Sequence, residues 1–344
     1  MMAEKVHNLS FVVQNGRKIP RVPTELCFAE RLGGWKVRWG IRRMKYAVEP
    51  GIYAVGNPDG DSVVLVSSNY KLSFDTLRKE LGGLNTWIMV LDTEGINVWC
   101  AAGKGTFGTD EIISHIGLVE LEKIVNHRKI ILPQLGASGV AAHEVKKRCG
   151  FSVIYGPIRA CDIIAFIKAG MKATEQMRQV CFSLYDRLVL TPVEFIIGGK
   201  YVLFAMAVLF ILSGMSASGY SSDLAMSSGI RSVVNLFAAY FGGAVIGPLL
   251  LPWLPGRSFS FKGFSVGLVV VAVFSLLKLT GDRLETIAWI FLIPVVSSFF
   301  TMNFTGASTY TSLSGVKKEM RIAVPLQVVA VVLGMGMWII GRFV

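Results

Sequence analysis

Residues 62–67, Ser-Val-Val-Leu-Val-Ser, form a β-branched run that predicts a short buried strand. A helical pattern follows over residues 74–81 and stops at Gly82-Gly83, and residues 86–92 repeat the strand pattern. Strands that alternate with helices favour a parallel sheet whose two faces are both covered by helices. We therefore expect an α/β domain built around this unit.

The same alternation continues along the chain. Two further strands are predicted at 129–133 and 151–155, with helices at 140–148 and 161–169. Ligands of such sheets bind at the carboxyl ends of the strands, because loops and helix N-termini converge there. The predicted strand ends are Ser67-Ser68-Asn69, Asp92-Thr93-Glu94, 134–138 and Gly156-Pro157.

The second half of the chain has the composition of a membrane protein. Apolar residues make up 52% of the chain and the mean hydropathy is +0.54, with the excess beginning at Tyr201. Few ionisable residues interrupt this half, so we expect it to serve as an anchor or a partner platform, with a transport pathway as the alternative. Five runs approach the ~20 residues that a spanning helix needs: 201–219, 233–254, 264–280, 286–306 and 322–341.

These patterns divide the chain into four parts. We expect a basic N-terminal segment at 1–48, the α/β domain at 49–172, a linker at 173–200 and a transmembrane domain at 201–344. The net charge is +12, and residues 31–45 hold six basic residues and no acid. Because no nucleic-acid-binding motif accompanies this run, we expect membrane lipid or an acidic protein as its partner, and no nucleic acid.

The basic residues also indicate an orientation. We expect no signal peptide, since Glu4, Lys5 and His7 precede only a short apolar stretch. The positive-inside rule then predicts a multi-pass protein of the inner (cytoplasmic) membrane, with its N-terminal domain in the cytoplasm and its C-terminus outside. The residues on the predicted inner side are Lys200, Arg257, Lys262, Lys317, Lys318 and Arg321, against Arg231, Arg283 and Arg342 on the other.

One of five scattered cysteines stands in an unusual segment, Asn97-Val98-Trp99-Cys100-Ala101-Ala102-Gly103-Lys104. The chain has no Cys-x-x-Cys, which argues against an intrinsic iron–sulfur cluster or a structural zinc site. A P-loop is excluded, because Val98 replaces its first glycine and Gly105 its hydroxyl residue. Residues 103–108 do fit Gly-x-Gly-x-x-Gly, but they lack the core strand and the following acid of a dinucleotide site.

Three roles for Cys100 remain open. A nucleophile needs a base, and the sequence places neither His115 nor His127 beside the sulfur. A free cysteine is otherwise often a small buried apolar residue. The third role is an axial ligand, because a metal held by a macrocycle needs only one protein atom. Ala101, Ala102 and Gly103 would then let the backbone approach a flat ring, with Trp99 packed at its edge.

At these residues the chain resembles the corrinoid protein of the microbial mercury-methylation pair (HgcA family), a relative of the large subunit of the corrinoid iron–sulfur protein. Residues 53–58 and 69–75 also resemble this superfamily, though they are less discriminating within it. The resemblance implies a Rossmann-like or flavodoxin-like corrinoid-binding domain with a cap helix near 97–104. It also implies an all-α transmembrane domain of five helices.

The resemblance further implies that Cys100 is the lower axial ligand of cobalt in a base-off corrinoid of the cobalamin type. Ser67, Asn69 and Ser73 are candidate contacts only because they lie at or just beyond a strand end. The other candidate cofactor contacts are Asn97, Val98, Trp99, Ala101, Ala102, Gly103 and Lys104.

The implied activity is methyl transfer to Hg(II), giving methylmercury, with methyl leaving a thiolate-ligated Co(III) as a carbanion equivalent. A small ferredoxin-like partner would re-reduce cobalt, since the four-cysteine cluster motif of the soluble relative is absent from this sequence. A methyl-tetrahydrofolate-type donor would remethylate it. The alternatives are a corrinoid methyltransferase or methyl carrier for another acceptor, and a nucleotide-binding membrane scaffold.

Overall fold

The computed structural model describes residue 6, residues 9–306, residue 308 and residues 313–344. The chain divides into two compact units: unit 1 is Met1–Val37 with Ile41–Val180, and unit 2 is Arg38–Gly40 with Cys181–Val344. The start of the predicted basic segment 1–48, including Glu4, Lys5 and His7, lies outside the described residues.

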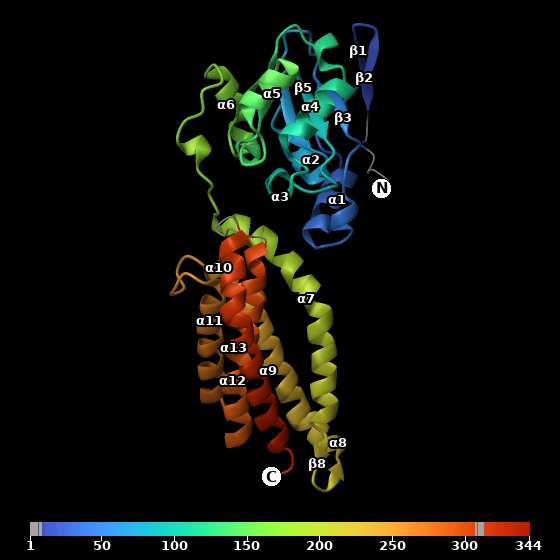
Figure 1. Cartoon of the computed structure of the whole chain (residues 1–344). Helices are drawn as coiled ribbons and strands as arrows, with labels where there is room; N and C mark the ends of the chain where they lie inside the picture. The colour runs from blue at the N-terminus through green and yellow to red at the C-terminus, as the bar shows by residue number, and fades with distance from the viewer. Residues whose placement is uncertain (1–5, 7–8, 307, 309–312) are drawn as a thin grey trace. The chain divides into compact units, whose positions relative to one another are not determined.

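Unit 1 is built on a seven-stranded mixed sheet of order β1-β2-β3-β5-β4-β6-β7 (Figure 1). Neighbouring strands among β4, β5, β6 and β7 pair in parallel, whereas β1 pairs antiparallel with β2, and β3 pairs antiparallel with β5. The strands are β1 (Ser10–Gln14), β2 (Arg17–Arg21), β3 (Gly51–Val55), β4 (Val64–Ser68), β5 (Thr86–Leu91), β6 (Lys129–Leu132) and β7 (Ser152–Tyr155).

The prediction of a purely parallel sheet was therefore wrong at the β1–β3 edge. A two-residue turn, Asn15-Gly16, joins β1 to β2, and both residues have positive φ, at 49° and 79°. Two-residue turns of this kind favour antiparallel hairpins, because their twist matches that of the paired strands. The Asn-Gly pair was the sequence signal for this hairpin.

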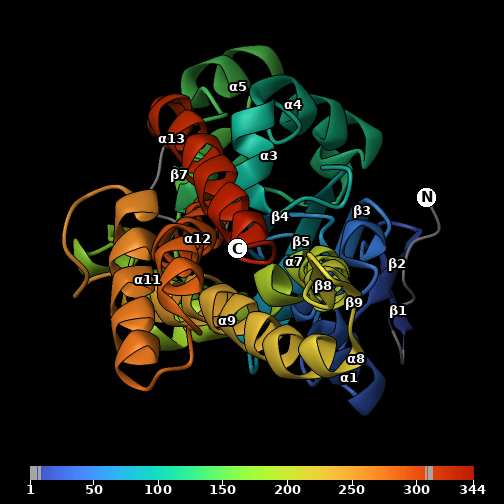
Figure 2. The same ribbon diagram turned by 90° about the horizontal axis from the view of Figure 1, so that it is seen from below.

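The helices predicted in the α/β domain are present, displaced by no more than a few residues. They form two layers, because both faces of the sheet are apolar. The helices α3, α4 and α5 lie together on one face (Figure 2), and α2 and α6 pack on the other. Alternation along a strand separates the two cores, since Val64 and Val66 face the first layer and Leu65 the second. The helices are α1 (Phe28–Arg38), α2 (Lys71–Lys79), α3 (Val98–Lys104), α4 (Thr109–Leu118), α5 (Ala142–Cys149) and α6 (Ile163–Lys168).

The strand order creates a topological switch point. The chain moves from β4 to β5 on one side and then crosses to β6 on the other side of β4. In open α/β sheets the crevice at the carboxyl ends of such strands is where ligands bind. The carboxyl ends of β4 and β6 are therefore the place where a ligand site is expected.

Unit 2 is helical, and five of its described helical segments are long and apolar enough to cross a membrane: Leu184–Leu212, Ser222–Leu250, Phe259–Leu276, Arg283–Gly306 and Ser314–Ile340. A short hairpin, β8 (Met215–Ser216) with β9 (Gly219–Tyr220), follows the first of them. The second is one continuous helix in which π-helical turns at Ala225–Gly229 and Gly242–Ile246 join three pieces. The helices are α7 (Leu184–Leu212), α8 (Ser222–Leu224), α9 (Ile230–Phe241), α10 (Gly247–Leu250), α11 (Phe259–Leu276), α12 (Arg283–Asn303) and α13 (Leu313–Ile340).

The first long helix begins inside the stretch 173–200 that was predicted as a linker. Ser183 and Asp186 form a capping box that starts α7 at Leu184, so Lys200 lies within the helix and does not flank it. The apolar run is uninterrupted only after Asp186 and Lys200, which is why the hydropathy pattern predicted the start of the helix at residue 201 and not at Leu184.

Close packing in unit 2 depends on glycines and on hydroxyls that bond main-chain carbonyls. A side chain at Gly267 would place its Cβ 2.3 Å from the Pro294 Cα, so α11 and α12 can approach only without one. At the second π-helical turn, Thr301 Oγ1 donates a hydrogen bond to the Gly243 carbonyl at 2.8 Å. This bond satisfies a carbonyl that the altered helical register leaves available.

Candidate functional site

Helix α3, which carries Cys100, lies at the switch point. It contacts β4 and the short 3₁₀ helix η3 (Gln134–Gly136) that follows β6. Val98, Ala101 and Ala102 are buried in the core layer above the sheet. The helix is therefore packed at the carboxyl ends of β4 and β6.

The ends of α3 are set by local chemistry. The Asn97 side chain caps the helix by accepting a hydrogen bond from the Cys100 amide at 2.9 Å, and Gly105 ends it with a φ of 91°. Cys100, Gly103 and Lys104 are exposed, and their spacing places them on one face of the helix. Trp99 is half-buried. The thiol is thus presented outward from a helix whose opposite face is fixed in the core.

Neither histidine named above pairs with this thiol. His115 Nε2 accepts a hydrogen bond from the Asp92 amide at 3.2 Å, while its Nδ1 bonds to the Glu111 carbonyl at 3.0 Å. His127 Nε2 bonds to the Ser62 carbonyl, at the amino-terminal end of β4. Both rings are held by main-chain groups, so neither of these two histidines serves Cys100 as a base.

Asn69 organises the loop that leads into α3. Its Oδ1 accepts hydrogen bonds from Thr93 N at 3.1 Å, Thr93 Oγ1 at 2.9 Å and Gly95 N at 3.0 Å. Its Nδ2 donates to Asp92 Oδ1 at 2.9 Å. The residue is only 3% exposed. The side chain proposed from sequence as a cofactor contact therefore joins the end of β4 to the β5–α3 loop.

Asn69→Ala is expected to lower the free energy of unfolding by about 1–3 kcal/mol, because it leaves several buried donors of Thr93 and Gly95 without an acceptor. Ser73→Ala is the matched control: Ser73 is half-buried in α2, and a change of less than about 0.5 kcal/mol is expected. Denaturant unfolding of the detergent-solubilised chain, followed by tryptophan fluorescence, measures both. Equal stabilities of the two variants would contradict this role.

The hydroxyls of Ser68 and Thr106 were not chosen as candidate contacts from the sequence. Ser68 belongs to β4, which contacts α3, and Thr106 follows α3 in the chain. Ser68 ends β4 and is 0% exposed, and Thr106 follows the Gly105 cap. Within the described part of the chain, Ser68 Oγ and Thr106 Oγ1 are buried without a hydrogen-bond partner. Ser67 Oγ, by contrast, donates to the Ser68 carbonyl at 3.3 Å. Unpartnered buried hydroxyls are costly, so each of these two atoms would gain from a further hydrogen-bond partner.

A close approach of two main chains holds α3 in place. A Cβ at Gly139 would lie 2.4 Å from the Phe107 carbonyl oxygen and 3.1 Å from the Ala102 Cα. Both neighbours are main-chain atoms, which cannot give way as a flexible side chain does. Only glycine therefore lets the loop after β6 pack against the end of α3.

Gly139→Ala is consequently expected to displace α3 and to lower ligand binding at the switch point by about tenfold or more, in line with the overpacking cost of about 1–3 kcal/mol. Gly117→Ala is the control, since a Cβ there meets nothing within 4 Å and alanine favours its helix. Limited proteolysis between α3 and α4 reports the displacement. An unchanged cleavage rate in Gly139→Ala would contradict the packing argument.

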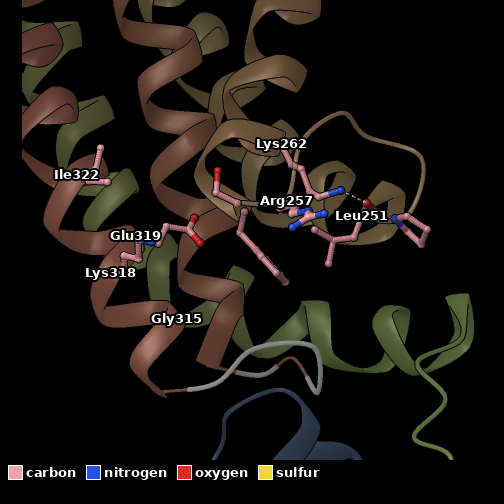
Figure 3. A pocket seen from close by; sticks show the side chains of 11 residues that line it. Leu251, Arg257, Lys262, Gly315, Lys318, Glu319 and Ile322 are labelled. Carbon is pink, nitrogen blue, oxygen red and sulfur yellow. Dashed lines mark hydrogen bonds between the residues drawn. The ribbon is translucent and has the colours of Figure 1, made fainter.

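Two cavities lie away from Cys100. One of about 530 Å³ is lined by residues including Arg21 and Asn85, at the edge where β5 begins. The other, of about 670 Å³, belongs to unit 2 and has Arg257, Lys262 and Lys318 in its lining (Figure 3). Lys262 Nζ donates there to the Leu251 carbonyl at 2.6 Å. The lining of this second cavity carries these three basic side chains, and the cavity lies at the amino-terminal ends of α11 and α13.

The donor set of the candidate site is a single thiol. Across the described ranges, no group of three or more histidine, cysteine, aspartate or glutamate side chains is arranged to hold a metal ion. One outward thiolate fits a metal that a macrocycle already coordinates, because such a metal needs one axial protein atom. The adjacent buried hydroxyls and the exposed Lys104 add polar groups suited to the amide rim of such a ring.

Comparison with known proteins adds independent information on this segment. Residues 42–167 match the family model described as CO dehydrogenase/acetyl-CoA synthase delta subunit. The gamma subunit of the acetyl-CoA decarbonylase/synthase complex from Archaeoglobus fulgidus is 32% identical over 118 residues, covering 34% of this chain and 25% of the relative. The corresponding subunit from Methanopyrus kandleri is 29% identical over 132 residues, or 38% and 28% of the two chains.

A corrinoid/iron–sulfur protein large subunit from Moorella thermoacetica is also similar, with 29% identity over 126 residues, 36% of this chain and 28% of the relative. Each match thus spans only about a quarter of the relative's length. The family match lies within the α/β domain and includes α3 with Cys100. Over 36% of its length, the chain is thus similar to a protein that is named for a corrinoid.

Proposed function

We propose, starting from this similarity to a corrinoid/iron–sulfur protein, that unit 1 binds a corrinoid and carries a methyl group on it. The observation that carries the proposal is the exposed Cys100 thiol on a capped helix at the switch point of the sheet. Sites of this kind bind flat or extended cofactors in α/β folds, because strand ends, loops and helix ends meet there.

The residues of α3 have distinct roles in this proposal. Cys100 would hold the metal of the corrinoid, and Asn97 would keep the thiol on the first turn of a fixed helix. Ala101 and Ala102 anchor the helix in the core, while Lys104 contacts a phosphate or amide of the ligand. When bound, the corrinoid supplies a cobalt centre that accepts and releases a methyl group.

We further propose Hg(II) as the methyl acceptor, on the resemblance of residues 97–104 to the mercury-methylation signature. A thiolate is a strong electron donor, so Cys100, in holding the metal of the corrinoid, would favour release of the methyl group to a soft electrophile. Transfer in this form needs no added electrons, but the corrinoid would then need two electrons before it accepts the next methyl group, and a ferredoxin-like iron–sulfur partner would supply them. The methyl group would come from a donor of the methyl-tetrahydrofolate type.

A second candidate is a methyl carrier for another acceptor. The similarity to subunits of acetyl-CoA decarbonylase/synthase complexes favours it, because those proteins are named for acetyl-CoA chemistry and none for mercury. Both candidates use Cys100 in the same way. They differ in the molecule that receives the methyl group.

Both candidate functions require that the chain binds a corrinoid through Cys100. The visible spectrum of the purified chain, loaded with a base-off corrinoid, tests this requirement. A stable corrin band with a thiolate-to-cobalt signature is expected, and a chain that binds nucleotide but no corrinoid would point to the scaffold alternative. Methyl transfer assayed with and without Hg(II) separates the two acceptors. Turnover that is unaffected by Hg(II) and forms no methylmercury would remove the mercury assignment.

We also propose that unit 2 anchors the protein in the cytoplasmic membrane with unit 1 inside and the C-terminus outside. The basic residues Arg257, Lys262 and Lys318 lie near the ends of α11 and α13 that follow inner-side loops in this orientation. A C-terminal alkaline phosphatase fusion is expected to be active, since that enzyme folds only outside the cytoplasm. An inactive fusion, with an active cytoplasmic reporter at the same site, would reverse the orientation.

A further inference from the structure

Helix α1 presents a large apolar face to the surface of unit 1. Phe28 is 80% exposed and Trp35 70%, and Leu32 between them is also exposed. At 3.6 residues per turn these three side chains fall within about 60° of the helix circumference, so they form one stripe. We call this stripe the aromatic face. Large apolar side chains gathered on one exposed helix face indicate a binding surface.

The opposite face of α1 is fixed to unit 1 by charge. Glu30 is buried and pairs with Arg78 at 2.6 Å and with Lys71 at 3.5 Å, and Asp75 pairs with both of these cations. Gly34 and Val37 are buried on the same side. The four buried charges form a neutral cluster that joins α1 to α2. The orientation of α1, with its aromatic face outward, is thereby fixed.

This orientation leaves the outer surface of α1 without acids. Glu30 is the sole acidic residue between Leu26 and Val48, and it is turned inward. Around the helix, Arg31 lies on one flank of the aromatic face and Lys36 on the other, and both are exposed. Four more basic residues follow shortly after in the chain: Arg38, Arg42, Arg43 and Lys45.

We propose that α1 is an interfacial helix that docks on an acidic lipid bilayer, with its aromatic face at the headgroup–acyl boundary and its basic flanks on lipid phosphates. A tryptophan and phenylalanine stripe between lysines and arginines is the pattern of helices that lie in the membrane interface. The negative surface charge of an acidic leaflet attracts such basic segments.

A bilayer is favoured over an acidic protein as the occupant for two reasons. The same chain carries five helices fit to span a membrane, so a lipid surface is always within reach of unit 1. The exposed Trp35 also suits the headgroup region, where an amphipathic ring meets both water and acyl chain. This docking would restrain the orientation of unit 1 at the membrane. It does not depend on the proposed corrinoid chemistry.

The experiment places the full-length chain, without cofactor, in nanodiscs whose lipids carry bromine on the upper acyl chain. Bromine quenches tryptophan at contact distance, and the difference between the wild type and Trp35→Phe isolates the contribution of Trp35. In phosphatidylglycerol discs at low salt this contribution is expected to fall by about half or more. In phosphatidylcholine discs, or in phosphatidylglycerol discs at about 1 M salt, where the Debye length is about 3 Å, the quenching should largely disappear.

Two pairs of variants complete the test. Phe28→Ser with Leu32→Ser should abolish the quenching of Trp35, whereas Leu118→Ser, at a 71% exposed site on α4, should not change it. Lys36→Gln with Arg42→Gln should reduce the quenching, and Lys146→Gln with Lys147→Gln on α5 should leave it intact. The proposal is overturned if no brominated lipid quenches the fluorescence of Trp35. It is also overturned if only an iron–sulfur protein partner alters this fluorescence.

Discussion

Cys100→Ala is expected to remove the thiolate-to-cobalt signature from the visible spectrum of the corrinoid-loaded chain and to reduce methyl transfer to background. The reason is that Cys100 is the one outward thiol on the helix over the switch point, and no nearby group of ligating side chains replaces it in the described residues. Alanine keeps the helix, since it is the best helix former. The loss would therefore report the missing ligand and not a missing fold.

Cys161→Ala is the matched control, because Cys161 is also exposed in unit 1 but lies in the short 3₁₀ helix η4 (Ala160–Asp162) before α6. Spectrum and activity of this variant should equal those of the wild type. Cys100→His is the finer comparison: an imidazole still binds a metal but donates less charge than a thiolate. We expect it to retain the corrin band with a shifted maximum and to slow methyl transfer. Full activity in Cys100→Ala would contradict the assignment of Cys100 as an axial ligand.

Glu30→Gln is expected to lower the free energy of unfolding of unit 1 by about 3–5 kcal/mol, the usual cost of removing one partner from a buried ion pair. The change leaves Arg78 and Lys71 buried with Asp75 as their remaining acidic partner in the cluster. Denaturant unfolding in detergent measures the effect. Glu122→Gln is the control, since Glu122 is 64% exposed and only 3.9 Å from Arg128, and a change below about 1 kcal/mol is expected.

The same cluster predicts an acid dependence. Burial alone would raise the pKa of Glu30, but the hydrogen bond and charge of Arg78, with the charge of Lys71, lower it from 4.5 to about 2. Because the folded pKa is the lower one, the unfolded chain takes up the proton first, and acid therefore destabilises the fold. The contribution is complete above about pH 4.5 and is lost as the pH falls towards about 2. Glu30→Gln should flatten this part of the stability profile. An unchanged slope would show that other groups cause it.

Most of the central sheet could be predicted from the sequence, because burial on both faces leaves a local signature. The apolar runs at β4 and β5 are fully buried strands, and their spacing from the intervening helix gives the parallel connection. The β1–β3 edge was missed. β3 pairs with β5 across an intervening strand and helix, and pairing between segments so far apart in the chain has no local pattern.

The candidate site divides in the same way. Its position at a strand end followed from the order of the elements, so Cys100 was identified before any contact was known. Asn69 was chosen for that position, but its actual partners, Thr93 and Gly95, lie more than twenty residues away. Ser68 and Thr106 were passed over, because only the packed structure shows that their hydroxyls are buried without partners.

The sequence by itself determined the alternation of strands and helices, the five apolar spans and the cysteine segment 97–104. Those features depend on periodicity, run length and residue type, which are local properties of the chain. Only the tertiary structure decided which way each helix faces. Glu30 and Trp35 both belong to α1, yet Glu30 is buried against Arg78 and Trp35 is exposed. The reason is that the contacts of Glu30 with residues of α2 fix the rotation of the helix.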